Sequence, residues 1–215
     1  MNIILLGAPA SGKGTQSEML AKRFNLYLLQ TGNLSRELAQ KNPRIKEIME
    51  SGKLIPQEEM TMYVLDFLRD HISEFKDILF EGFPRFISQY EALDKFLKTK
   101  GDDIDAIISL DISEEEAIKR ISSRRICVKC GKVYNIITNP APGEKCECGG
   151  ELIQRKDDSP QSVKVRLQYY NDNTKELIDY LDKQGKLIRV DGARPIDDIQ
   201  IDLAKLVEGI KNATG

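Results

Sequence analysis

The sequence predicts an α/β fold built on a five-stranded parallel sheet with helices on both faces. Two patterns support this prediction: short apolar runs of strand length recur along the chain, and longer segments with helical periodicity separate them. A third observation is a glycine-rich loop between the first apolar run and the first helical segment. The 215 residues are enough for one such core with insertions.

Five apolar runs are predicted to form the strands: Ile3–Leu6, Tyr27–Leu29, Ile78–Phe80, Ile104–Leu110 and Leu187–Val190. After the fourth run, Ser113 and Glu116 have the spacing of a capping box, which predicts the start of a helix. Ser159 and Pro160 are typical of another helix start, and that helix is expected to continue to about Asp182. The closing segment has apolar residues at helical spacing: Ile199, Leu203, Leu206, Val207 and Ile210.

The first loop, residues 7–15, reads Gly-Ala-Pro-Ala-Ser-Gly-Lys-Gly-Thr and has the features of a phosphate-binding loop. Its glycines let the backbone fold around a polyphosphate with the N–H groups pointing inward, and Lys13 can reach the β and γ oxygens. The following helix adds the partial positive charge of its N-terminus. Gly14 stands where the strict motif has Ser or Thr, and Thr15 would supply the hydroxyl one residue later. We therefore expect a fold of the P-loop NTPase type.

Two segments break the alternation of strands and helices. Residues 30–56 contain two short helical patterns, and residues 123–157 are rich in Cys, Gly and Pro with few periodic apolar positions. Ligands of open α/β folds bind at the carboxyl edge of the sheet, and both segments are expected there as inserts. The predicted core therefore comprises residues 1–29, 57–122 and 158–215, with the inserts as movable flaps over a phosphate site.

Glu81 ends the third apolar run, and a carboxylate at that place beside a phosphate loop can hold Mg²⁺ through water. Four residues later, Arg85 offers a planar, permanently charged group for a second phosphate. In isolation, Glu81 could equally cap a strand and Arg85 could form a surface ion pair, but the phosphate loop favours the functional interpretation. Arg36 and Lys53, in the first insert, are further candidate cations, and Lys53 is the weaker candidate.

All four cysteines fall in the second insert, as Cys127-x2-Cys130 and Cys146-x-Cys148. Two close pairs of thiolates predict a closed tetrahedral zinc site that stabilises a small segment without a core of its own. Iron or an empty site is the alternative. A catalytic metal is not expected, because four protein ligands leave no open position. The clustering also argues against a secreted disulfide scaffold and predicts a reducing, cytoplasmic environment.

The composition is that of an ordinary soluble protein, with 40% hydrophobic and 31% charged residues. A net charge of −2 gives no overall attraction to nucleic acid, so any anion site has to be made locally. No apolar stretch approaches the length of about 18 residues that a membrane span requires. We expect a monomer that binds neither nucleic acid nor membrane.

In their order along the chain, these motifs resemble those of the adenylate kinases, a family of nucleoside monophosphate kinases, in its long-lid form with a cysteine metal cluster. The resemblance covers nearly the whole chain. It includes the Lys-Gly-Thr ending of the phosphate loop, the signature Gly82–Arg85 followed by Gln89, and the loop Asp191–Pro195. It implies that residues 30–56 bind the nucleoside monophosphate (NMP) and that residues 123–157 form a lid.

The resemblance also implies roles for individual residues. ATP contacts are expected from Ala10, Ser11, Gly12, Lys13, Gly14, Thr15, Arg120, Arg124, Val133, Tyr134 and Arg194. AMP contacts are expected from Thr31, Arg36, Lys53, Leu54, Ile55, Gly82, Phe83, Pro84, Arg85, Gln89, Arg155 and Arg166. The cations expected around the transferring phosphoryl group are Lys13, Arg85, Arg120, Arg124, Arg155 and Arg166. Gln89 would read the base of AMP through its amide. The stretch Gly52–Pro56 would close around adenine, and residues 155–158 would form the returning edge of the lid.

The chain departs from the family pattern at several places. Glu81 stands where the family usually has Asp, Asn33 replaces another Asp, and Ala10 replaces a common glycine. Asn135 stands where His is frequent. The second cysteine pair has one intervening residue instead of two, and Gly149-Gly150 would supply the tight backbone that this spacing needs. None of these changes removes a charge that phosphoryl transfer needs.

The implied activity is reversible phosphoryl transfer in which Mg·ATP and AMP give two ADP, with Mg²⁺ as cofactor and a structural Zn²⁺ in the lid. Related kinases with another base preference, such as GTP:AMP or UMP/CMP enzymes, are alternatives, although Thr31 and the long lid favour AMP as acceptor. A P-loop GTPase or ATPase switch is a second alternative, but the sequence lacks the Asn-Lys-x-Asp guanine motif. A zinc-ribbon nucleic-acid binder that uses the arginines of residues 120–166 is disfavoured by the near-neutral charge.

Overall fold

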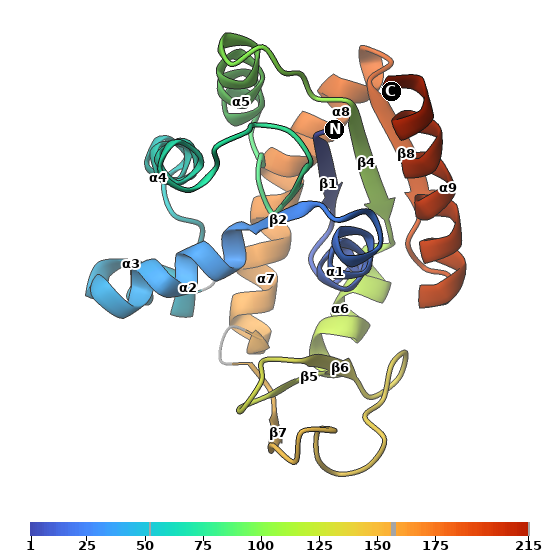
Figure 1. Ribbon diagram of the computed structural model, residues 1–215. Helices are drawn as coiled ribbons and strands as arrows, with labels where there is room; N and C mark the ends of the chain where they lie inside the picture. The colour runs from blue at the N-terminus through green and yellow to red at the C-terminus, as the bar shows by residue number, and fades with distance from the viewer. Residues whose placement is uncertain (52, 156–157, 215) are drawn as a thin grey trace.

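The computed structural model describes residues 1–51, 53–155 and 158–214 (Figure 1). Gly52, which belongs to the stretch expected to close around adenine, lies outside the described residues. So do Lys156 and Asp157, in the expected returning edge of the lid, and Gly215 at the end of the predicted core. None of the helices in the described part of the chain is both long and apolar enough to cross a membrane.

The five predicted strands form one sheet in the order β2-β3-β1-β4-β8, and every neighbouring pair is parallel. The strands are β1 (Ile3–Gly7), β2 (Tyr27–Gln30), β3 (Ile78–Glu81), β4 (Ala106–Asp111) and β8 (Leu187–Asp191). This arrangement confirms the predicted five-stranded parallel sheet. β4 begins at Ala106, later than the predicted start at residue 104. Just before it, the Asp105 N–H donates to the Asn2 carbonyl at 2.9 Å, and the Asp105 carboxylate accepts from the Asn2 N–H (N···Oδ2 2.6 Å).

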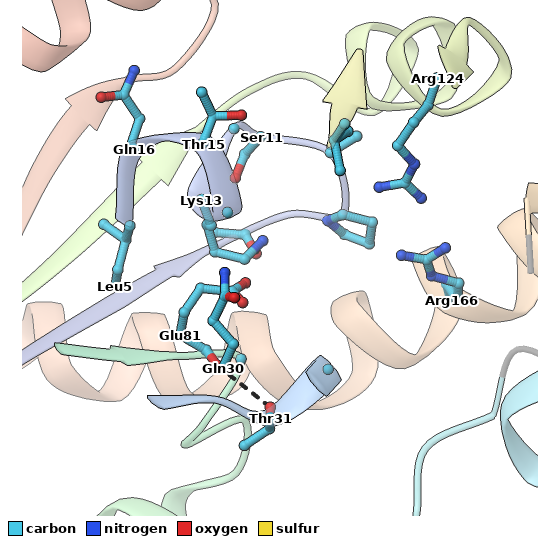
Figure 2. Close-up of a pocket in the computed structure, with 18 of the residues that line it drawn as sticks. Leu5, Ser11, Lys13, Thr15, Gln16, Gln30, Thr31, Glu81, Arg124 and Arg166 are labelled. Carbon is cyan, nitrogen blue, oxygen red and sulfur yellow. Dashed lines mark hydrogen bonds between the residues drawn. The ribbon is translucent and has the colours of Figure 1, made fainter. Parts of the chain in front are cut away.

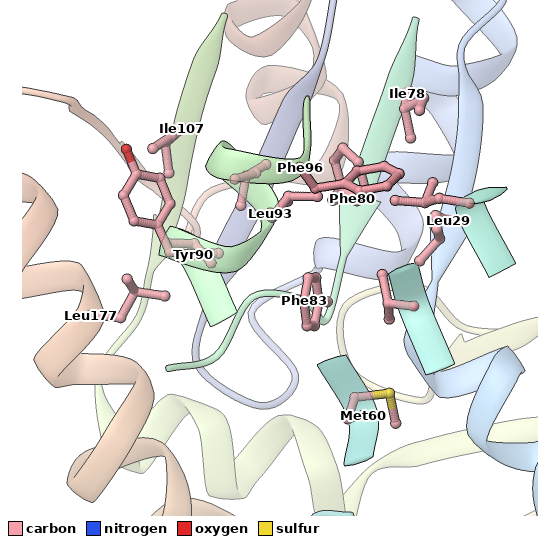
Figure 3. Close-up of a cluster of buried hydrophobic side chains, with 14 of the residues drawn as sticks. Leu29, Met60, Ile78, Phe80, Phe83, Tyr90, Leu93, Phe96, Ile107 and Leu177 are labelled. Atoms are coloured by element: carbon pink, nitrogen blue, oxygen red, sulfur yellow. The ribbon is translucent and has the colours of Figure 1, made fainter. Parts of the chain in front are cut away.

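Side chains of the buried strands alternate between two faces, and each face has its own helices. Ile4 and Leu6 belong to one buried cluster, whereas Ile3 and Leu5 belong to another. The first cluster, drawn in Figure 3, includes side chains of α4 (Gln57–His71), α5 (Ile87–Thr99) and α8 (Lys175–Lys183). The second includes side chains of α1 (Lys13–Phe24) and α9 (Ile196–Thr214). Helices therefore cover both faces of the sheet, as predicted.

Both predicted helix starts are present. α6 (Glu114–Ser122) begins after Ser113, whose hydroxyl accepts a hydrogen bond from the Glu116 N–H at 3.1 Å. The helix that begins at Pro160 runs on to Lys183 in three parts: α7 (Pro160–Tyr169), the π-helical turn η2 (Tyr170–Thr174) and α8. The spacing of the apolar residues does not predict the π turn, which widens the helix locally.

Both interrupting segments stand apart from the main sheet (Figure 1). Residues 30–56 contain α2 (Thr31–Lys41) and α3 (Pro43–Glu50), as their two helical patterns predict. Residues 123–157 contain a small antiparallel sheet in the order β6-β5-β7, made of β5 (Arg124–Cys127), β6 (Val133–Asn135) and β7 (Leu152–Ile153). The sequence does not reveal this sheet, because strands of this length are too short to show an alternating pattern.

Candidate active site

A cleft of about 920 Å³ opens at the carboxyl ends of β1 and β3, where both inserts contribute to its walls (Figure 2). The structure brings nearly all of the expected nucleotide-binding residues to this cleft, although they are spread along the chain. Those that line it are Ala10, Ser11, Gly12, Lys13, Gly14, Thr15, Thr31, Arg36, Lys53, Leu54, Ile55, Glu81, Gly82, Pro84, Arg85, Gln89, Arg120, Arg124, Val133, Tyr134, Arg155, Arg166 and Arg194. Phe83 does not line it.

The loop between β1 and α1 curls tightly at the base of the cleft. Gly12 caps α1 with a φ of 99°, in the region that favours glycine. A Cβ atom on Gly7 would lie 2.5 Å from the Leu110 carbonyl oxygen and 2.7 Å from Ser11 Oγ, so no larger residue fits there without movement. The loop therefore has the close backbone approach and the helix N-terminus that a phosphate group requires.

Lys13 is half-buried in this loop, and its ammonium donates hydrogen bonds to the carbonyls of Gly7 (2.9 Å) and Ala8 (2.7 Å). Burial lowers the pKa of Lys13 from 10.5 to about 8. The nearby Glu81 carboxylate opposes that shift, whereas the Arg85 guanidinium adds to it. The Arg166 and Arg124 guanidiniums act in the same direction as that of Arg85, so several cations share this end of the cleft, as expected for a site that receives an anionic ligand.

Glu81 and Arg85 flank the turn that follows β3. Glu81 is half-buried, and its carbonyl oxygen accepts a hydrogen bond from the Thr31 hydroxyl at 3.4 Å (Figure 2). A Cβ atom on Gly82, whose φ is 80°, would lie 2.5 Å from Thr31 Oγ1, so this turn also needs glycine. Arg85 Nε donates to the Gly82 carbonyl at 2.8 Å, and burial lowers the pKa of its guanidinium. The turn thus holds one carboxylate and one guanidinium at the same wall of the cleft.

Gln89 and Phe83 differ in what they can offer a ligand. The Gln89 side chain accepts from the Arg85 N–H at 2.8 Å and donates to the Gln57 carbonyl at 3.1 Å. An amide has two donor hydrogens and two acceptor lone pairs, so one of each is left for another partner. Phe83 is fully buried in the hydrophobic cluster of Figure 3, so its side chain belongs to the core.

Arg120 anchors part of the cleft wall. Its guanidinium bonds to Glu116 (Nε···Oε1 2.7 Å) and to the carbonyls of Gly192 (2.8 Å) and Ala193 (3.2 Å). These bonds join α6 to the loop after β8, which carries Arg194. Three N–H groups of this guanidinium are therefore already directed at protein acceptors, and Arg120 fixes the loop in addition to contributing its charge.

Arg124 and Arg166 meet at the carboxylate of Asp158, which the resemblance places in the returning edge of the lid without assigning it a role. Asp158 accepts from Arg124 through both oxygens, with Nε···Oδ2 at 2.8 Å and a short Nη2···Oδ1 contact. Arg166 Nη1 lies 3.0 Å from the same Oδ1. Figure 2 shows the two guanidinium groups pointing toward one another in the pocket. The partner of these arginines could be found only from the fold, since it lies 34 residues from Arg124.

The four cysteine sulfurs of the second insert lie within 4.8 Å of one another. The Cys127–Cys148 and Cys130–Cys146 separations are 3.5 and 3.6 Å. Four thiolates around a tetrahedral Zn²⁺ with bonds of about 2.3 Å are separated by about 3.8 Å, so the cluster fits such an ion. The cluster could therefore hold a metal, as the cysteine spacing predicts.

The surroundings of the cluster lower the pKa of the Cys127 and Cys146 thiols and raise that of the Cys130 thiol to about 12. The Tyr134 hydroxyl lies 3.4 Å from Cys146 Sγ, and this contact lowers the pKa of the Cys146 thiol from 9.0 to about 6. Gly149 has a φ of 77°, and a Cβ atom on Gly150 would lie 2.5 Å from Cys127 Sγ. Both glycines are thus needed for the tight turn that the one-residue cysteine spacing requires.

The family model for adenylate kinase matches residues 5–186. The chain belongs to the adenylate kinase family. It is 40% identical to the adenylate kinase of Archaeoglobus fulgidus, over 99% of this chain and 100% of that protein. The adenylate kinases of Caldanaerobacter subterraneus and Petrotoga mobilis are 40% and 38% identical, over 97% and 96% of this chain and 97% of each relative. These relationships confirm the resemblance inferred from the motifs and make the protein a phosphotransferase.

One departure from the adenylate kinase pattern has a visible structural consequence. Ala10 stands where a glycine is common, and its φ is 61°. An alanine in this left-handed conformation costs roughly 1–2 kcal/mol, because its Cβ approaches the following carbonyl oxygen. A glycine would adopt this conformation without that cost, whereas Ala10 adopts it at some cost in stability.

The cleft of this adenylate kinase family member also contains two polar residues to which the motifs assign no role, Asn33 and Glu18. Asn33, at the position of the usual Asp, donates to Gln30 Oε1 at 2.8 Å and accepts a short hydrogen bond from Arg36. Glu18 lines the cleft one helical turn after Gly14, and burial together with the Glu81 charge raises its pKa. The i, i+4 spacing from Gly14 is the sequence signal that could have identified Glu18.

Proposed function

We propose that this protein catalyses reversible transfer of the γ-phosphoryl group of Mg·ATP to AMP, giving two ADP. The observation that carries the proposal is the convergence of cations from separate elements on one cleft. Lys13 comes from α1, Arg85 from the turn after β3, Arg124 from β5 and Arg166 from α7. A phosphoryl group in transfer carries its charge on oxygens that such cations can neutralise from several sides.

The proposed reaction needs little proton chemistry. An anionic phosphate oxygen of AMP attacks the γ-phosphorus of ATP, and the bond from that phosphorus to the β–γ bridging oxygen breaks to release ADP. Because the attacking oxygen is already charged, no strong general base is required, and catalysis consists of positioning and charge neutralisation. Lys13 would contact the β and γ oxygens, and Arg85 would contact the phosphate of AMP and the group in transit.

The two nucleotides would be divided between the inserts. In this proposal residues 30–56 bind AMP, with Thr31 and Gln89 at the base, and residues 123–157 close over ATP. Closure of both would exclude water, which otherwise competes as acceptor. Residues 1–29, 57–122 and 158–215 would form the core that carries the phosphate loop.

Two metal ions belong to the proposal. Glu81 would hold Mg²⁺ through water, which suits an ion that keeps much of its hydration shell, and the half-buried carboxylate beside Lys13 fits that use. The bound ion would neutralise charge on the ATP phosphates. Zn²⁺ would occupy the four-cysteine cluster as a structural ion, since four thiolates leave it no open position.

We also propose that the protein acts in the cytoplasm, as a monomer and without nucleic acid. All four cysteines are free of disulfide bonds, which fits a reducing compartment. The net charge of −2 supports the absence of a nucleic-acid partner.

Product formation with separate acceptors tests the proposed activity. Mg·ATP is mixed with AMP, GMP, CMP or UMP, and a control contains no acceptor. We expect ADP to form rapidly with AMP alone. Transfer to several monophosphates would replace the proposal with a kinase of broader base preference. Hydrolysis without an acceptor, and no transfer, would contradict the kinase assignment.

The lowered pKa of Lys13 predicts an alkaline limit to ATP binding. In the free protein Lys13 loses its proton near pH 8, so kcat/KM for ATP should fall as the pH rises above about 8. Bound phosphates favour the charged form, so kcat should hold to a higher pH. Between pH 8 and 10.5 the unfolded chain binds more protons at this lysine, so its contribution to the free energy of unfolding should rise with pH. A kcat/KM profile that stays level through pH 9.5 would contradict this prediction.

A further inference from the structure

We propose that Asn135 is a positioning residue that holds the turn 135–139 of the second insert in the conformation that binds the donor nucleotide. This inference rests on the proposed function and names a further residue on which ATP binding depends. In this proposal Asn135 acts through the turn and not by contact with the reacting phosphates. It occupies the position where the family frequently has His.

The turn that follows β6 is held by hydrogen bonds to Asn135. The side-chain Oδ1 accepts from the Ile137 N–H at 2.9 Å and from the Thr138 N–H at 3.1 Å. The backbone N–H and carbonyl of Asn135 pair with the carbonyl and N–H of Asn139 at 2.9 and 3.0 Å. Ile136 and Ile137 are 57% and 52% exposed, so burial of apolar surface contributes little to the turn. Its conformation therefore depends mainly on one asparagine.

Asn135 also attaches the turn to α6. Its Nδ2 donates to the Arg120 carbonyl at 2.9 Å, and the neighbouring Ile136 N–H donates to the Ser123 carbonyl at 3.0 Å. The guanidinium of the same Arg120 bonds to two carbonyls of the loop after β8. Arg120 therefore holds the turn through its main chain and the loop through its side chain, so both are fixed to one point of the core.

The turn and the start of α9, which follows that loop, face one another across a second cavity of about 420 Å³. Thr138 and Asn139 line this cavity from the turn. Thr15, at the end of the phosphate loop, lines both this cavity and the main cleft. In the proposed complex, a donor with its phosphates on the phosphate loop extends past Thr15, and its nucleoside lies between these two walls. Asn135 thus fixes the position of one wall of the donor site.

The amide of Asn135 suits this role better than the imidazole that is frequent in the family. An asparagine Oδ1 has two lone pairs, so it can accept from both N–H groups of the turn while Nδ2 donates to a carbonyl. A neutral imidazole that donates through one nitrogen has a single acceptor left, so it can accept from only one of them. Asn135 can therefore order the turn before ATP arrives. A site that is already ordered binds its ligand with the full intrinsic affinity.

The Asn135→Leu variant tests the proposal, because leucine has a similar size and makes none of these side-chain hydrogen bonds. We expect the Kd of Mg·ATP, measured by calorimetric titration without AMP, to rise about 10-fold, which corresponds to a turn that is correctly placed about one tenth of the time. KM for ATP should rise by the same factor, whereas KM for AMP and kcat at saturating ATP should stay near the wild-type values. An unchanged Kd, or an equal rise in both KM values, would overturn the proposal.

Asn42→Leu is the matched control. The Asn42 side chain also accepts from two backbone N–H groups, those of Arg44 and Ile45 at 3.0 and 3.4 Å, but it lies in the first insert and does not line the cleft. We expect this variant to leave the Kd of Mg·ATP unchanged. A comparable rise in both variants would show that loss of such bonds in either insert weakens ATP binding, and would contradict a role specific to Asn135.

A measurement on the unmodified protein covers the case in which Asn135→Leu does not fold. In hydrogen exchange followed by NMR without nucleotide, the Ile137 and Thr138 N–H groups should exchange at least about 10-fold more slowly than in an unstructured chain, because both are bonded to Asn135. Exchange at the unstructured rate would contradict a turn that is ordered before ATP binds. If the wild-type protein bound Mg·ATP but transferred no phosphoryl group to AMP, the proposed function would fail, and the titrations would still decide the role of Asn135.

Discussion

Replacement of Arg85 with alanine is expected to lower kcat by about 10²–10³, as removal of one preorganised donor does at other sites of charge stabilisation. Arg85 is placed for this effect because it lies half-buried at the wall of the cleft and its guanidinium is oriented by the Gly82 carbonyl. The measurement is steady-state formation of ADP from Mg·ATP and AMP at saturating concentrations of both nucleotides.

Two further variants separate charge from geometry. Arg85→Lys keeps the positive charge and loses the planar fork, so its kcat should lie between the wild-type and alanine values. Arg23→Ala removes an exposed arginine that pairs with Glu208 outside the cleft, and it should keep full activity. The assignment of Arg85 is wrong if the alanine variant has the melting temperature of the wild-type protein and still retains near-normal turnover.

The main sheet could be predicted because its strands are buried on both faces. In such a strand nearly every residue is apolar, so Ile3–Leu6 and Ile78–Phe80 are visible as continuous runs. The residue types that follow these runs, glycines with Lys13 after the first and Glu81 after the third, then identify the carboxyl edge where the cleft opens. This part of the site therefore follows from local sequence and topology together.

The rest of the site depends on contacts that leave no local pattern. Asp158 is paired through the tertiary fold with residues of β5 and α7, and no spacing rule connects it to either. Phe83 lies within a binding motif, yet its side chain completes the core. The strands β5–β7 could not be predicted because they are too short to show an alternating pattern, and the buried cluster beside them is small, consisting of Cys127, Tyr134 and Cys146.

Because that buried cluster is so small, we expect removal of the metal to unfold the second insert. Burial of so few side chains cannot offset the conformational entropy of ordering residues 123–157. The free energy of metal binding, about 10–16 kcal/mol for structural zinc in small domains, would supply most of the stability of the insert. We expect chelation to abolish measurable activity, because Arg124 and Tyr134 lose their positions, while the far-UV circular dichroism of the core persists.

Thiol reactivity and metal analysis check this prediction together. All four thiols should resist a thiol reagent before chelation and react after it, and one zinc ion per chain should be recovered. Visible absorbance would show that the cluster binds iron in place of zinc. The insert would then still depend on a bound metal for its fold. If the four thiols react freely from the start and chelation leaves activity intact, the insert does not need a metal. In that case the hydrogen bonds of β5–β7 and the pairing of Asp158 with Arg124 would have to hold it, and both could be tested by substitution in the metal-free protein.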